Sequence, residues 1–206
     1  MSDLEHGSAP PTTSGSRLQN LLAMVAASGG RGVAPVELWN PPDCGDMDLR
    51  IAADGTWFYA GTPIGRPALV RLFASVLTRE DRRYVLKTPV EKVGITVEDA
   101  PFLAVDVARE ESAQGPVLVF RTNLDDVVRC GPGHDLRFAQ GPGEGVVRPY
   151  VHVRRGLDAR LTRAVFMEVV EMGEVRVMEG VAMFGIASGP TFYPMMAASD
   201  LERAAS

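Results

Sequence analysis

The stretch from Trp39 to Phe73 constrains the fold more than any other part of the chain, because a hairpin signal leads there into a helix signal. Asp54-Gly55 separates two runs with strand character, Met47–Ala53 and Thr56–Ala60. An Asp-Gly pair adopts positive φ angles at low cost and is a strong signal for a two-residue β-hairpin turn. The stretch therefore predicts two antiparallel strands at this point.

A helix is expected after this hairpin. Pro67 suits a first helical turn, where its missing amide hydrogen would have no partner in any case. Leu69, Leu72 and Val76 repeat with the spacing of one helical face. This pattern predicts an amphipathic helix of about 12 residues.

The remainder of the chain is rich in strand signals. Asp158 is expected to cap a helix that has Val165 and Val169 on one face and ends at Gly173. Predicted strands lie at Tyr84–Lys87, Val93–Val97, Phe102–Val107, Pro116–Thr122, Val127–Cys130, Leu136–Phe138, Tyr150–Arg154, Val181–Ala187 and Thr191–Tyr193.

Two pairs of segments resemble each other within the chain. Gly65–Phe73 resembles Gly156–Phe166, and Ile51–Tyr59 resembles Ile186–Tyr193. The likeness fits either an internal duplication or the general similarity of hairpins and helix starts.

The N-terminal part is expected to form a region of its own ahead of the two lobes. Residues 1–15 have the composition of a disordered tail, and Ser16 begins a predicted short helix that ends by Ser28. This helix either docks on the body or meets a protein partner. The start of the chain lacks the pattern of a secretory signal, and no apolar run reaches the roughly 18–20 residues of a membrane helix. These features favour a cytoplasmic protein.

Charge and cysteine content exclude several classes of protein. The net charge of −5 argues against a nucleic-acid binder or a binder of anionic membranes. Cys44 and Cys130 do not form a disulfide pattern, and the three histidines are scattered, so no metal site is expected. No phosphate-binding loop or nucleophile motif is present, and the sequence indicates no particular cofactor.

The two lysines are the most distinctive candidates for a binding site. The chain has 19 arginines but only two lysines, Lys87 and Lys92, and both fall in one short run with Glu91 between them. Lysine is a compact charge that suits a phosphate oxygen, a carboxylate or a Schiff base. Chance clustering in an arginine-rich chain is the alternative explanation.

Other candidates surround this run. Arg66 precedes the predicted helix, where free amide groups attract anions. Trp57 and Tyr59 share one face of a strand, which makes them either a stacking surface or core residues. Asp99 and Asn123 add a carboxylate and a hydrogen-bonding amide.

Four stretches carry a similarity to a known family: CGDMDLRIAADGTWFYAGTPIGRPALVRLF, YVLKTPVEKVGITVEDAPFLAVDV, FRTNLDDVV and FGIASGPTFYP. In these stretches the chain resembles a proteobacterial family known as domain of unknown function 1285. The string TPVEKVGITVEDAPF is the most specific of these. The resemblance implies an α+β fold of two lobes with duplicated strand and helix motifs, the second lobe being similar to a pleckstrin-homology domain. It also implies a nucleotide-like ligand between the lobes and a link to signalling, and it assigns no catalytic residue.

These observations predict four regions. A tail with a short helix occupies 1–32, a first lobe 33–90, a strand-rich second lobe 91–195, and a second tail 196–206. The expected function is binding of a nucleotide-like or phosphorylated small molecule in a regulatory role. The ligand-binding candidates are Trp57, Tyr59, Arg66, Lys87, Glu91, Lys92, Asp99 and Asn123. The alternatives are an enzyme that uses Lys92, Glu91 or Asp99 as acid–base groups, and a protein-interaction module.

Overall fold

The computed structural model describes residues 19, 23, 25, 33–141 and 147–204. The tail 1–15 lies outside these residues, as does most of the helix expected at 16–28. Gln19, Ala23 and Val25 are helical, and Val25 is 2% exposed within the core. No described helix is long and apolar enough to cross a membrane.

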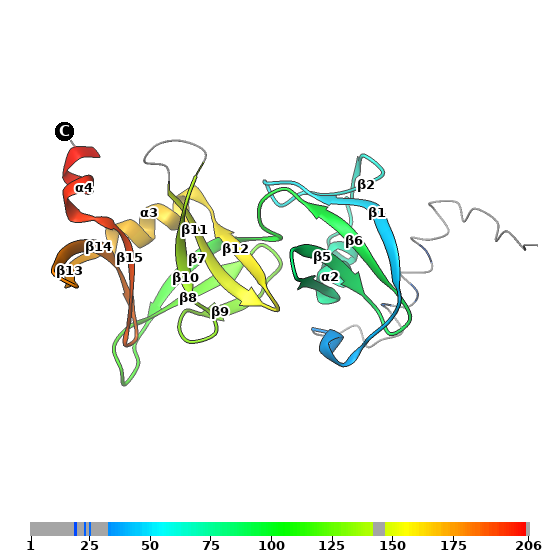
Figure 1. Ribbon diagram of the computed structural model, residues 1–206, viewed down its shortest axis with the longest axis horizontal. Helices are drawn as coiled ribbons and strands as arrows, with labels where there is room; N and C mark the ends of the chain where they lie inside the picture. The colour runs from blue at the N-terminus through cyan, green and yellow to red at the C-terminus, as the bar shows by residue number, and fades with distance from the viewer. Residues whose placement is uncertain (1–18, 20–22, 24, 26–32, 142–146, 205–206) are drawn as a thin grey trace, which may run out of the picture.

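The first lobe is built on a six-stranded sheet in the order β3-β2-β1-β6-β5-β4. The central neighbours β1 and β6 run parallel, and the other pairs are antiparallel. A 3₁₀ turn, η1, precedes the sheet (Figure 1). The bounds are η1 Val36–Leu38, β1 Asp43–Ile51, β2 Trp57–Tyr59, β3 Thr62–Pro63, α2 Pro67–Ser75, β4 Leu77–Glu80, β5 Arg83–Lys87 and β6 Lys92–Val97.

Both predictions for the Trp39–Phe73 stretch are confirmed in outline. β1 and β2 pair antiparallel, with Ile51 opposite Trp57 across the Asp54-Gly55 turn. Helix α2 begins at Pro67 and buries Val70, Phe73 and Ala74. The helix ends at Ser75, earlier than the apolar pattern indicated, because the chain enters strand β4 at Leu77.

The second lobe contains a second six-stranded sheet in the order β10-β11-β12-β7-β8-β9. Its central neighbours β7 and β12 are parallel, and the remaining pairs are antiparallel. The bounds are β7 Phe102–Glu110, β8 Val117–Thr122, β9 Val127–Arg129, β10 Leu136–Gln140, β11 Val147–Arg154 and β12 Leu157–Leu161.

Helix α3 (Arg163–Glu171) follows β12 and differs from the predicted helix at its start. The prediction that Asp158 caps this helix is wrong, because Asp158 lies inside strand β12. Thr162 is the actual cap, and its hydroxyl accepts a hydrogen bond from the Val165 amide at 3.5 Å. The parallel pairing of β12 with β7 holds residues 157–161 in an extended form.

A third sheet lies at the end of the molecule opposite the first lobe (Figure 1). It has the order β13-β14-β15 and consists of β13 Glu174–Met178, β14 Val181–Ser188 and β15 Thr191–Ala197. Helix α4 (Ala198–Ala204) follows, within the segment expected to be a tail, and contacts β14 and β15. Strand β13 was not predicted.

The two large sheets have the same topology. In each, three consecutive strands spread outward from the first member of a central parallel pair, and three return to its second member. The correspondence therefore joins β1–β6 with β7–β12. It differs from the pairs of segments that resemble each other in sequence. Those pairs matched the β1–β2 hairpin with β14–β15 in the third sheet, and α2 with α3.

The fold as a whole is mostly β, with few helices, in a two-lobe arrangement. Strand β6 belongs to the first sheet, so the chain crosses between the sheets at Glu98–Pro101 rather than between residues 90 and 91.

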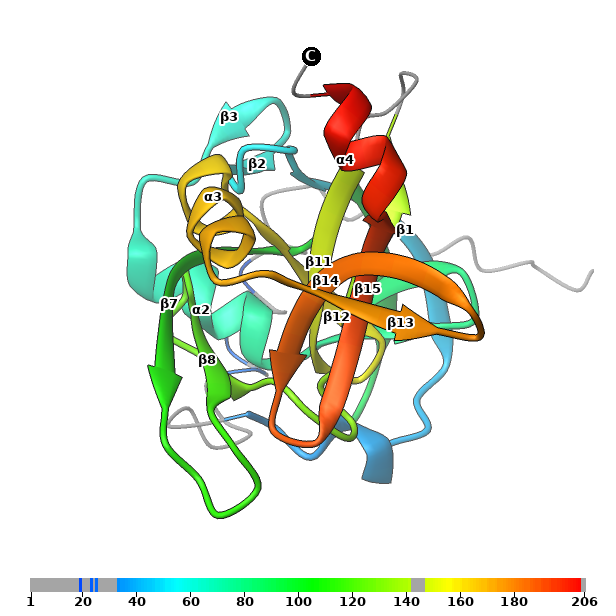
Figure 2. The same ribbon diagram turned by 90° about the vertical axis from the view of Figure 1, so that its left-hand side faces the viewer.

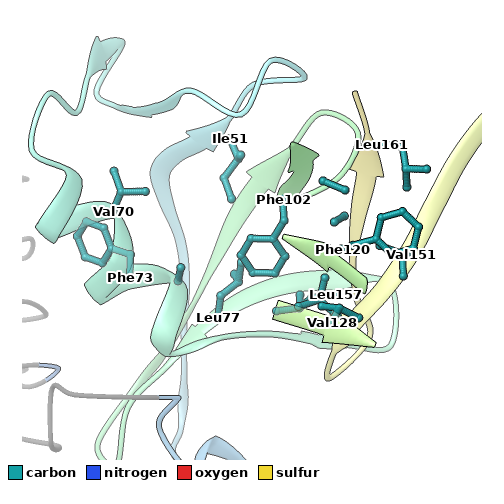
Figure 3. Close-up of a cluster of buried hydrophobic side chains, with 14 of the residues drawn as sticks. Ile51, Val70, Phe73, Leu77, Phe102, Phe120, Val128, Val151, Leu157 and Leu161 are labelled. Carbon is teal, nitrogen blue, oxygen red and sulfur yellow. The ribbon is translucent and has the colours of Figure 1, made fainter. Parts of the chain in front are cut away.

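One apolar core continues through both lobes. Phe102 is fully buried and lies between Ile51 and Leu77 of the first lobe and Leu157 of the second (Figure 3). Fully burying such side chains contributes about 1.5–3 kcal/mol each. The lobes are therefore held together by the same kind of contact that stabilises each of them.

Arginines of the β11–β12 turn reinforce this junction. Arg155 pairs with Glu37 and donates a hydrogen bond to the Ala34 carbonyl of the first lobe. Arg154 donates to the Ala74 carbonyl at 3.2 Å and binds Asp126 at 2.5 Å. The contacts with Glu37, Ala34 and Ala74 attach the turn to the first lobe.

Candidate functional site

The lysine pair forms a compact ionic cluster within the first sheet. Lys87 on β5 lies directly opposite Lys92 on β6. Glu80 on β4 binds both, with its Oε1 2.8 Å from the Lys87 Nζ and its Oε2 2.6 Å from the Lys92 Nζ. Like charges facing each other across a sheet repel, and one shared carboxylate offsets that repulsion. The sequence predicted that the lysines lie together, but it missed Glu80.

Hydrogen bonds within this cluster shift two pKa values. Those from Lys87 and Lys92 lower the pKa of Glu80, and the hydrogen bond to Glu80 raises the pKa of Lys92. Both ammonium groups are thus committed to a neighbouring carboxylate. An incoming anion would have to compete with Glu80 for them.

Glu91, the candidate between the two lysines, contributes its backbone to the turn that joins them. Its carbonyl accepts a hydrogen bond from the Thr88 hydroxyl at 3.0 Å in the turn between β5 and β6. Its carboxylate makes no ion pair within the described part of the chain. Strand pairing places Glu80 opposite Arg83, across a turn in which Asp81 has a positive φ of 52°, and the side chains of Glu80 and Lys87 meet along the strands.

The two aromatic candidates belong to the core of the first lobe. Trp57 is 2% exposed and stacks on Phe73, with ring centroids 6.2 Å apart and planes inclined by 11°. Tyr59 is half-buried and packs against the same core. Of the two interpretations left open by the sequence, the structure supports core packing.

Arg66 and Asn123 lie in separate places. Arg66 is exposed at the N-cap of α2, and its side chain makes no capping hydrogen bond. The Asn123 Oδ1 accepts a hydrogen bond from the Leu103 amide at 3.0 Å, beside the Gly55 turn of the first lobe. No contact joins either residue to the lysine pair among the described residues.

Asp99 occupies the junction of the lobes, with 11% of its side chain exposed. Its Oδ1 accepts a hydrogen bond of 2.6 Å from the Tyr150 hydroxyl, and its Oδ2 lies 2.8 Å from the Arg160 Nε. Arg148 approaches to 3.8 Å. Asp99 was predicted as a ligand-binding candidate, but its partners Tyr150, Arg160 and Arg148 were not predicted.

A hollow of about 230 Å³ opens beside Asp99, between the two lobes. Strands β4 and β5 supply one wall and strands β10–β12 the other. We call it the arginine–tyrosine hollow; it is lined by Arg79, Tyr84, Asp99, Ala100, Arg137, Ala139, Tyr150 and Asp158.

Two arginines lie over two tyrosines in this hollow. The Arg79 guanidinium is 5.4 Å from the Tyr84 ring centre, and the Arg137 guanidinium is 4.2 Å from that of Tyr150. Such cation–π contacts hold a guanidinium in place without neutralising it. Burial raises the pKa of both tyrosines, and the hydrogen bond to Asp99 raises that of Tyr150 further, so both hydroxyls stay protonated at neutral pH.

Positive charge exceeds negative charge around the hollow. Asp99 is approached by Arg160 and Arg148, while Asp158 binds Arg137 at 2.7 Å and His152 at 3.1 Å. Arg148 and Arg160 lie outside the lining itself, in which Arg79 and Arg137 balance Asp99 and Asp158. Arg79 itself has no carboxylate partner among the described residues.

A second, larger hollow lies on the junction beside helix α2. Its volume is about 420 Å³ and its walls are mainly apolar. The two cations in it are paired, Arg71 with Asp125 and Arg154 with Asp126. We call it the α2 hollow; it is lined by Val33, Ala68, Arg71, Leu72, Ala74, Ser75, Leu124, Asp126 and Arg154.

The lysine cluster borders a third hollow, of about 390 Å³, in the first lobe. Asp43, Glu80 and Asp81 balance Arg82, Arg83 and Lys92 there. Arg83 bridges Asp43 at 2.5 Å and Asp46 at 2.7 Å. Among the described residues, no group of three or more His, Cys, Asp and Glu side chains is placed to hold a metal ion.

Comparisons with known proteins match both parts of the chain. Residues 34–100 match "Domain of unknown function (DUF1285), N-terminal domain". Residues 101–195 match "Protein of unknown function (DUF1285), C-terminal domain". A search of curated proteins finds no match.

Two solved structures resemble the chain. A DUF1285 family protein from Silicibacter pomeroyi DSS-3 is 51% identical with a TM-score of 0.80, and the match covers 89% of this chain and 98% of that one. One from Shewanella baltica OS155 is 32% identical with a TM-score of 0.49, over 61% of this chain and 91% of that one. The sequence resemblance is thereby confirmed, and the chain belongs to the DUF1285 family, whose function is unknown.

Proposed function

We propose that this chain binds a small organic anion, and that the arginine–tyrosine hollow receives its phosphate or carboxylate group. The observation that carries the proposal is the Arg79 guanidinium, which lines the hollow and has no carboxylate partner in the described part of the chain. In a chain with a net charge of −5, such a guanidinium offers an anion a local positive site, with Arg137 on the opposite wall.

The size of the hollow limits what it takes. Sites for drug-sized ligands usually measure about 300–1,000 Å³. At about 230 Å³ the hollow accommodates the anionic end of a phosphorylated molecule, while a base or sugar extends beyond it. A nucleotide-like ligand is therefore proposed with its phosphate, rather than its ring, as the recognised part.

The position of the hollow supports a regulatory role. Arg79 and Tyr84 belong to the first lobe, and Arg137 and Tyr150 to the second. An anion held by Arg79 and Arg137 together would favour one relative position of the lobes, because it binds that arrangement best. On this basis, the proposed role of ligand binding is in signalling.

We also propose that the second lobe is similar to a pleckstrin-homology domain. Its support is a six-stranded sheet with helix α3 packed against β7 and β12. The duplicated motif is supported by the equal strand order of the two large sheets.

A thermal-shift titration with inorganic phosphate, ATP and a phosphorylated sugar tests the binding proposal. A ligand at 100 times its Kd stabilises the folded state by about 2.7 kcal/mol, which raises the Tm by several degrees. Arg79→Gln is expected to weaken binding about tenfold, because it removes one charge-assisted contact. Arg121→Gln is the matched control, since Arg121 is an exposed arginine outside the hollow.

Two outcomes would overturn this assignment. One is the absence of any shift with all three probes. The other is a shift that Arg79→Gln leaves unchanged while Lys92→Ala or Arg71→Gln abolishes it, which would move the site to the lysine cluster or to the α2 hollow.

A further inference from the structure

Strand β13 leaves one edge of the third sheet open. It hydrogen-bonds to β14 on one side, and no strand lies on its other side within the described part of the chain. Every residue from Glu174 to Met178 is exposed. In Figure 2 the β13–β14 hairpin faces the viewer at this end of the molecule.

The open edge is also apolar. Val175 is 55% exposed and Val177 75%, and both lie on the face of the sheet that buries Phe184, because they pair with Phe184 and Ala182. Met178 and Val181 are exposed on the opposite face of the hairpin. A stretch of exposed valine on a regular strand is unfavourable for an isolated chain.

Within the described part of the chain, β13 has only one of the usual protections of a sheet edge, its charged pair Glu174 and Arg176. Native proteins shield edge strands with charged side chains, lysine above all, and with proline, bulges, short length or a covering segment. Among the other edges, β3 has two residues and ends in Pro63, β4 has four residues, β9 has three residues, and β10 lies against β15. Strand β13 has five residues, no proline or lysine, and an uninterrupted register with β14.

The charges on β13 make this edge complementary to itself. Glu174 and Arg176 lie on one face, 2.5 Å apart, and each is 47% exposed. In an antiparallel pair related by a two-fold axis, a residue on the axis faces its own copy. An axis at Val175 places each Glu174 opposite the Arg176 of the other chain and brings the two copies of Val175 together.

The neighbouring registers are unfavourable. An axis at Arg176 would set two guanidinium groups face to face, and an axis at Glu174 would do the same with two carboxylates. Opposite charges across a strand pair stabilise it and like charges destabilise it. Among these three registers, the charge pattern therefore favours the one centred on Val175, which alone forms two opposite-charge pairs.

We propose that β13 is a dimerisation edge whose partner is a second copy of this chain. The two copies of β13 pair antiparallel about Val175, and the two three-stranded sheets become one six-stranded sheet. The valine faces of the two hairpins then continue across the axis. This inference is independent of the proposed anion site.

Light scattering after size exclusion tests the proposal with the full chain. The wild type is expected to have the mass of two chains at about 100 µM and to dissociate on dilution. Val175→Lys sets two ammonium groups against each other on the axis, and it is expected to weaken association at least about tenfold. An unchanged Tm would show that this exposed substitution leaves the monomer folded.

Charge reversal tests the register. Glu174→Arg and Arg176→Glu each bring like charges together and are expected to weaken dimerisation. The double variant Glu174→Arg/Arg176→Glu restores both cross-strand pairs and is expected to recover it. Arg129→Glu is the matched control, because it reverses an exposed, paired arginine on β9.

Three results would overturn the proposal. One is a wild-type chain that stays monomeric over the whole concentration range. Another is a set of β13 variants that all dimerise as the wild type does. The third is a double variant no better than either single variant, which would exclude the register centred on Val175.

Discussion

At the scale of single residues, Glu80 contributes to stability through its two ion pairs. It holds two partly buried ammonium groups, with 12% of the Lys87 side chain and 24% of the Lys92 side chain exposed. Glu80→Gln leaves these charges without a carboxylate. We expect it to lower the free energy of unfolding by about 1–3 kcal/mol at pH 7, measured by urea denaturation.

The pH dependence of this effect follows from the two pKa shifts. The lowered pKa of Glu80 gives stability that is present above the ordinary value of 4.5 and lost as pH falls through the folded pKa. The raised pKa of Lys92 gives stability that is present below 10.5 and lost as pH rises through the folded pKa. The difference between wild type and Glu80→Gln should therefore be greatest at neutral pH and shrink at both extremes.

Glu110→Gln is the control for this prediction. Glu110 pairs with Arg129 on the surface, with about half of each side chain exposed, and such pairs contribute about 0–1 kcal/mol. An equal cost for the two substitutions would show that the Glu80 cluster is no stronger than a surface ion pair.

Local sequence anticipated only part of the candidate site. The lysines are five residues apart, so a turn between two strands was enough to place them together. Asp99 was named, but Arg160 and Tyr150 reach it through the pairing of distant strands. For Trp57 both a stacking surface and core packing stayed open, because spacing along a strand does not tell which face is covered.

At the scale of elements, Gly185 is needed where β14 and β15 shift register. A Cβ there would lie 2.3 Å from the Tyr193 carbonyl oxygen and 2.9 Å from the Pro194 Cα, both of which are backbone atoms. Since a backbone cannot move aside as a flexible side chain can, Gly185→Ala should destabilise the protein by about 1–3 kcal/mol.

Gly131→Ala is the matched control in the same denaturation series. Nothing lies within 4 Å of a Cβ built on Gly131, and its φ is not positive. This substitution should be neutral or slightly stabilising. Should Gly185→Ala prove equally mild, the close approach of β15 to Gly185 would be wrong.

Elements were predictable where their signal is local. The Asp54-Gly55 turn and Pro67 fix the β1–β2 hairpin and the start of α2 by short-range chemistry. Asp158 was misplaced because β12 is held by β7, more than 50 residues earlier in the chain. The alternation of Glu174–Met178 was a usable strand signal, but it follows a helix directly and was overlooked.

At the scale of the whole molecule, the shared core predicts a single unfolding transition. Trp39 and Trp57 both lie in the first lobe, so tryptophan fluorescence reports on that lobe, whereas far-UV circular dichroism reports on both. The two signals should change together in urea. Phe102→Ala should lower the free energy of unfolding by about 3–5 kcal/mol and shift both curves equally.

The control for this prediction is Val127→Ala, because Val127 is 67% exposed on β9. It should leave both curves near their wild-type midpoints. Separate transitions in the wild type would mean that the lobes unfold independently and that the Phe102 contacts contribute little between them.

The sequence pattern did not predict the order of the strands within the sheets. Both lobes depend on a parallel contact between their first and last strands, and nothing in the strands themselves indicates that pairing. Two lobes were anticipated, but the repeated segments were matched wrongly, since equal topology does not require equal residues. The crossing at Glu98–Pro101 follows from the pairing of β6 with β1, which is equally non-local.

The equal strand order of the two large sheets bears on the ancestry of the chain. If one sheet-forming unit was duplicated and fused, α2 is an insertion in the first copy, while α3, the third sheet and α4 are an extension of the second. This extension has no counterpart in the first lobe, so the duplication supplied no strand to cover its edge. Strand β13 would then be a late acquisition, open at its edge because the ancestral unit ended before it.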